Sequence, residues 1–232
     1  MDANLARPSA NQVARRMLSV NLLQYRLASE IAFQEAADET ERDEAADSIA
    51  DLQDHLMETG IWDSVVPSER ALFTSFPGSW TEAQFGYAAW RRESLGVLLW
   101  ALNLVPAIPP YDQQFQDLGA VIDPDQWLFA IEESFLVPED DIILAQRVAE
   151  TWYWRSQSGK PPFDEENNPE RIAFLAAQYA AGGHIPPTLE GDFPAFGLPF
   201  HMLDDERVAY VQALASERYF CLSWLMGLQA WE

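Results

Sequence analysis

The chain has 232 residues, of which 48% are hydrophobic, so it can bury one large core or two modest ones packed together. Its 37 acidic and 14 basic residues give a formal net charge of −23. This charge argues against direct nucleic-acid binding, because phosphate contacts need a basic surface. A basic protein is the partner that it favours, through electrostatic steering.

The apolar runs are much shorter than the roughly 20 residues of a membrane-spanning helix, and the chain starts with a polar stretch. We therefore expect a cytoplasmic protein without membrane contact. Cys221 is the only cysteine, which excludes a disulfide within the chain and a cluster of thiolate metal ligands. Its place in an apolar stripe indicates a residue of the core.

The first predicted helix runs from about residue 11 to residue 36. Apolar residues recur there every three or four positions, which places them on one helix face. The face comprises Val13, Met17, Val20, Leu27 and Ile31, widened by Leu18, Leu22 and Tyr25. A second helix is predicted to follow the acidic stretch 38–47, whose charge suits a helix start, and to stop at Gly60.

Proline and capping residues predict the next helices. Pro67 begins a short one. Thr81 and Gln84 have the spacing of a capping box, which starts a helix that we expect to end near Leu104. Residues 105–125 are predicted to form a connection with little regular structure.

The second half of the chain is predicted to add four helices. The first is short and passes through Trp127, and the others span about 139–157, 169–182 and 204–226. Residues 184–203 are rich in proline and glycine, and we interpret 183–203 as an inserted loop. The sequence thus predicts an all-α fold, with residues 1–232 forming one helical bundle of about seven helices with long irregular loops.

Two glutamates occupy equivalent positions in two otherwise apolar helical stripes. Glu93 and Glu217 are each followed by an apolar residue, a Trp and a Leu at the same offsets. A buried carboxylate is costly unless it is paired, and Arg92 and Arg218 adjoin the two glutamates while Arg155 lies in a third predicted helix. We predict that these five residues form a buried ion-pair network. The alternatives are a pocket whose carboxylates bind a cation or act as acid and base, and simple exposure at the surface.

Three segments resemble those of a bacterial family, domain-of-unknown-function family 4272. They are Trp-Arg-Arg-Glu-Ser-Leu-Gly-Val-Leu-Leu-Trp-Ala-Leu at 90–102, Val-Ala-Glu-Thr-Trp-Tyr-Trp-Arg at 148–155, and Ser-Glu-Arg-Tyr at 216–219 with Leu-Ser-Trp-Leu-Met-Gly at 222–227. The resemblance covers about residues 13–228. It implies an architecture, and the family brings no assigned activity, cofactor or substrate.

A second group of candidates is aromatic. Three Phe residues in the irregular segment either fold onto the core or form a patch for a partner, together with the surroundings of Tyr111 and Trp127. The three are Phe193, Phe196 and Phe200.

The sequence carries no phosphate-binding loop, no nucleophile elbow and no spacing typical of a metal or cofactor site. We therefore predict no catalytic residue, no metal and no cofactor. The preferred function is a non-catalytic protein-binding factor, such as an inhibitor, an immunity protein or an accessory protein. The alternative is an enzyme or small-ligand binder with a carboxylate–arginine pocket.

Overall fold

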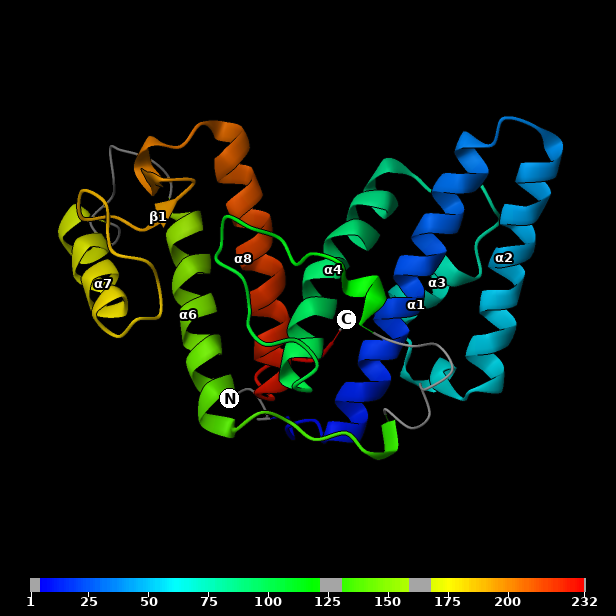
Figure 1. Ribbon diagram of the computed structural model, residues 1–232, viewed down its shortest axis with the longest axis horizontal. Coiled ribbons are helices and arrows are strands. Elements are labelled where there is room, and N and C mark those ends of the chain that lie inside the picture. The colour runs from blue at the N-terminus through cyan, green and yellow to red at the C-terminus, as the bar shows by residue number, and fades with distance from the viewer. Residues whose placement is uncertain (1–4, 122–130, 159–167, 232) are drawn as a thin grey trace.

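The computed structural model describes residues 5–121, 131–158 and 168–231, and these ranges contain seven α-helices (Figure 1). The helices are α1 (Ala10–Glu35), α2 (Glu39–Glu58), α3 (Pro67–Phe73), α4 (Glu82–Ala101), α6 (Glu139–Gln157), α7 (Pro169–Ala181) and α8 (Asp205–Leu225). The all-α prediction is confirmed. The predicted helix through Trp127 lies mostly outside the described residues.

The longer helices form a row in which each packs on the next, in the order α2, α1, α4, α8, α6 and α7 (Figure 1). Helix α4 and helix α8 lie in the middle of this row and contact neighbours on both sides. This explains the long apolar stretches of α4, where residues 93–99 are all buried. Within the described residues, no helix combines the length and the apolar character needed to cross a membrane.

The helix ends follow the capping signals of the sequence. Thr81 forms the expected capping box with Gln84, and Gly60 follows α2 in a left-handed conformation (φ 66°). Helix α4 ends three residues earlier than predicted. Its last turn is closed by a hydrogen bond from the Leu104 amide to the Leu99 carbonyl, with Asn103 in the left-handed region (φ 59°).

The predicted inner face of α1 is wrong in its C-terminal half. Tyr25 and Ile31 are exposed, while Arg26 and Glu30 are fully buried. The reason is that the buried face is selected by the neighbours of α1, and here it carries an ion pair that no count of apolar residues reveals.

Irregular segments cover the row of helices. Residues 102–117 cross α4 and α8, and the segment that follows α7 contains a small antiparallel hairpin of β1 (Pro194–Ala195) and β2 (Leu198–Pro199) (Figure 1). Three short 3-10 helices complete the regular structure of the described residues: Ile61–Ser64, Leu118–Ala120 and Phe200–Met202.

Gly96 allows one of these segments to pack closely on α4. A Cβ atom at Gly96 would lie 2.2 Å from the ring of the buried Phe115. The connection that contains Phe115 therefore packs against α4 at a position without a side chain.

We predict that Gly96→Ala lowers the free energy of unfolding by about 1–3 kcal/mol, because the ring must shift within a packed core. Gly86→Ala is the matched control in the same helix, since nothing lies within 4 Å of its Cβ position. There the better helix propensity of Ala should raise stability by about 0.5–1 kcal/mol. Urea unfolding of both variants measures the difference, and equal effects would contradict this packing argument.

Candidate functional site

Glu93 and Arg218 form a buried ion pair between α4 and α8. Arg218 donates from Nε and Nη2 to Glu93 Oε2 at 2.9 and 2.8 Å, and neither side chain has any exposed surface. The other carboxylate oxygen, Oε1, accepts the backbone amide of Phe115 at 3.1 Å. Both oxygens of Glu93 are therefore engaged within the protein.

Arg218 also holds the connection that follows α4. Its Nη1 donates to the Pro109 and Pro110 carbonyls at 2.7 and 3.2 Å, and its Nη2 donates to the Gln113 carbonyl at 2.6 Å. The guanidinium lies 4.9 Å from the ring centroid of Tyr111. Arg218 thus holds the irregular backbone of residues 109–113 against α8.

Glu217 points to a different partner. Its Oε2 accepts from Arg91 Nη1 at 3.2 Å and from Ser94 Oγ at 2.9 Å, and 20% of its side chain is exposed. Adjacent residues of a helix point about 100° apart, so Glu217 and Arg218 reach different parts of α4. Arg91, which sequence reasoning missed, takes the place expected for Arg92. Arg92 acts on Glu93 through its charge and forms no ion pair with it.

Arg155 pairs with neither glutamate. It donates from Nε and Nη2 to the two oxygens of Asp192 at 2.8 and 2.7 Å, and both residues are buried. Asp192 also accepts the amides of Phe193 and His201, and its Oδ2 lies 3.0 Å from His201 Nδ1. The predicted five-residue network is therefore divided into separate pairs, and Asp192 is the partner that the helical pattern did not reveal.

Two further buried pairs lie at α1. Arg26 pairs with Glu30 at 2.6 Å, and Glu30 accepts the amide of Trp80 at 3.1 Å. Arg16 pairs with Glu69 and donates to the Ser64 carbonyl at 3.0 Å. The (i, i+4) spacing of Arg26 and Glu30 was a signal in the sequence, but it is equally common on exposed helix faces.

Burial and pairing act in opposite directions on these carboxyl groups. Burial raises the pKa of Glu93 above its usual value, and Arg218 and the Phe115 amide reduce this shift. Burial alone would raise the pKa of Asp192. The hydrogen bonds and charge of Arg155, together with the hydrogen bonds from His201 and from the Phe193 amide, outweigh this effect, so the pKa of Asp192 is lowered.

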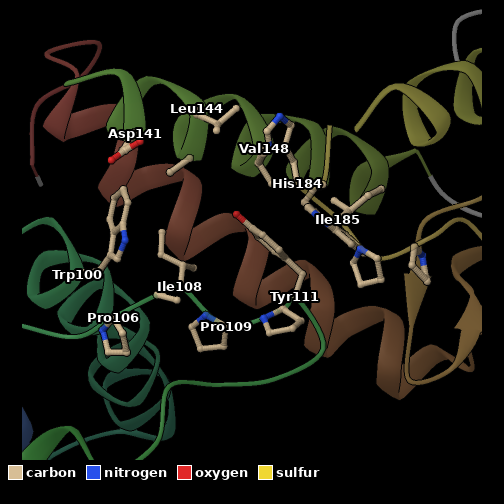
Figure 2. Close-up of a pocket in the computed structure, with 17 residues that line it drawn as sticks. Trp100, Pro106, Ile108, Pro109, Tyr111, Asp141, Leu144, Val148, His184 and Ile185 are labelled. Carbon is tan, nitrogen blue, oxygen red and sulfur yellow. The ribbon is translucent and has the colours of Figure 1, made fainter. Parts of the chain in front are cut away.

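The main cleft of the described residues is lined by none of the residues of these pairs, although Arg218 contacts one of its walls. It has a volume of about 580 Å³ and lies between α6, residues 106–111, the end of α4 and residues 183–186 (Figure 2). None of Arg92, Glu93, Arg155, Glu217 and Arg218 lines it. A carboxylate–arginine pocket therefore does not coincide with this cleft.

The aromatic candidates are divided between the core and the surface. Phe193 and Phe200 are fully buried, and Tyr111 is buried against Trp152, with ring centroids 5.1 Å apart. Phe196 at the tip of the hairpin is 37% exposed. Trp127 lies outside the described residues. In the described ranges, no three His, Cys, Asp or Glu residues gather in a way that suits a metal ion.

The fold and these pairs define an all-α protein in which buried arginine–carboxylate pairs fix irregular connections to a row of helices. The chain belongs to the family Domain of unknown function (DUF4272), whose model matches residues 2–151. The match contains the segment 90–102 and ends before the motif at 216–227. No curated protein and no solved structure matches the chain.

Glu93→Gln should lower the free energy of unfolding by about 3–5 kcal/mol, because the change leaves the Arg218 charge buried without its partner. Glu217→Gln should cost only about 1–3 kcal/mol, since this carboxylate is partly solvated. Denaturant unfolding of both variants measures the ranking. A Glu93→Gln variant as stable as the wild type would contradict a structural role for the pair.

Asp192 gives a prediction on pH. Because its pKa is lowered by folding, its contribution to stability is complete above the ordinary carboxyl value and is lost as pH falls through the lower folded value. The stability difference between wild type and Asp192→Asn should therefore shrink as pH falls below about 4. Urea unfolding between pH 7 and pH 3 measures it, with the exposed Asp140→Asn as control. A difference that stays constant over this range would contradict the pairing.

Proposed function

We propose that the protein is a non-catalytic binding factor that acts on a basic protein partner in the bacterial cytoplasm, as an inhibitor, immunity protein or accessory protein. The observation that carries this proposal is the net charge of −23 on a chain whose buried arginines are engaged in internal pairs. Its outer surface is therefore dominated by acidic side chains. Such a surface raises the association rate with a basic protein and repels nucleic acid.

The position of the strongest chemical candidates supports the same proposal. Glu93 and Arg218 bind each other and backbone groups, and both side chains are removed from solvent. These contacts favour a structural role for the pair over a catalytic one. A binding factor needs surface complementarity and no reactive group. The arrangement fits that requirement.

A second candidate is a small-ligand binder or enzyme at the other carboxylate–arginine cluster. It is favoured by the partial exposure of Glu217 beside Arg91, whose Nη2 also donates to the hydroxyl of Tyr87 at 3.1 Å. For this candidate, Glu217→Gln would abolish ligand binding while the protein stays folded. For the preferred function, the variant keeps its partner.

The test is retention of proteins from a lysate of the native host on the immobilised full chain. We expect one protein with a basic isoelectric point, recovered in stoichiometric amount and released when the ionic strength is raised to about 0.5 M, since salt screens the attraction. Glu217→Gln serves as the matched variant and should retain the same protein. Retention of acidic proteins alone, or of none at low salt, would contradict the proposal.

A further inference from the structure

The main cleft is a groove between two walls. One wall is α6, with Leu144 and Val148, and the other is the proline-rich connection 106–111 with Ile108. Trp100 lies at one end, and His184 and Ile185 lie at the other (Figure 2). Such an apolar, elongated surface suits an extended chain that inserts a side chain between the walls.

Tyr111 places a polar group in this apolar surface. The residue is only 7% exposed, and its ring is held by stacking on Trp152 and by the guanidinium of Arg218. Its hydroxyl oxygen makes no hydrogen bond to any residue that the structure describes, and Figure 2 shows it pointing into the cleft between the connection and α6. A hydroxyl held at the wall of an open cleft can exchange its water for an acceptor on a ligand.

The chemistry of that ligand group follows from the state of the hydroxyl. Burial raises the pKa of Tyr111 well above its ordinary value, and the charge of Glu93 adds to the shift while Arg218 opposes it. The hydroxyl therefore stays protonated at neutral pH and offers its proton. A backbone carbonyl is the acceptor that every extended peptide carries.

Charge supplies the third element of recognition. Asp141 is the one acidic residue that lines the cleft, and Asp140 lies beside it in the first turn of α6, while the neighbouring Glu139 is paired with Arg7. The lining contains no lysine or arginine. This end of the cleft is therefore complementary to a cationic side chain.

We propose that this cleft binds an extended segment of the basic protein partner. An apolar side chain of the segment packs between Ile108 and Leu144, a backbone carbonyl accepts from the Tyr111 hydroxyl, and a lysine or arginine pairs with Asp141. The inference rests on the proposed function and assigns its binding surface.

The test uses a phage-displayed library of random peptides, about twelve residues long, selected on the full chain. We expect enrichment of sequences with Lys or Arg within about three residues of a large apolar residue. The most enriched sequence, synthesised with a fluorescent label, is then titrated by fluorescence anisotropy. Failure to enrich any sequence, or enrichment of acidic sequences, overturns the inference.

Variants of the cleft locate the binding. Leu144→Arg, which blocks the groove from an exposed position of α6, should weaken binding by at least about 30-fold. Met57→Arg makes the same kind of change on α2 at the other end of the row and should alter binding by less than about twofold. Tyr111→Phe keeps the ring and removes the hydroxyl, and should weaken binding about 5–10-fold. Asp141→Asn should weaken it about threefold at low salt and leave it unchanged at high salt.

The two proposals fail in different ways. If the selected basic peptide binds Leu144→Arg and Tyr111→Phe as tightly as the wild type, it binds elsewhere and the cleft assignment is wrong, while the proposed function stands. If the chain retains no basic protein from the host lysate, the proposed function fails, whatever peptide the cleft accepts.

Discussion

The buried pair of an arginine with a carboxylate is the interaction on which this structure depends. Two charges removed from water are costly, and their attraction compensates only when the remaining donors and acceptors are also satisfied. For Arg218 with Glu93 and for Arg155 with Asp192, the backbone of irregular segments supplies further partners. Arg218 with Glu93 binds residues 109–115, and Arg155 with Asp192 binds the segment around the hairpin. Each of these two pairs joins a helix to an irregular connection.

This constraint reaches the surface where we expect binding. The connection 106–111 forms one wall of the main cleft, and Arg218 donates hydrogen bonds to its Pro109 and Pro110 carbonyl groups. Tyr111 lies in the same place and contacts both the guanidinium and the ring of Trp152. These contacts hold the Tyr111 ring in the irregular wall with its hydroxyl towards the cleft. Preorganisation of this kind reduces the entropy that binding would otherwise cost.

The sequence predicted the fold much better than the site. Helix ends depend on nearby residues, so Thr81 with Gln84 and Gly60 could be read directly. Ion-pair partners are chosen across the fold, and 37 acidic residues compete for 13 arginines. Asp192 lies in an irregular segment without any helical period, and the roles of Arg91 and Arg92 depend on a turn of about 100° around α4. The cleft joins segments that are distant in the chain, so no local motif marks it.

The most direct test of the central claim is native-state hydrogen exchange of a double variant, Arg218→Met with Glu93→Leu. Replacing both charges by apolar groups of similar size removes the pair without leaving a buried charge, so the loss of global stability should be smaller than that of Glu93→Gln. If the pair fixes the connection, the Phe115 amide should lose protection by at least about 100-fold, while the amides of α1 and α2 keep theirs. Unchanged protection of Phe115, beside unchanged global stability, would contradict the account.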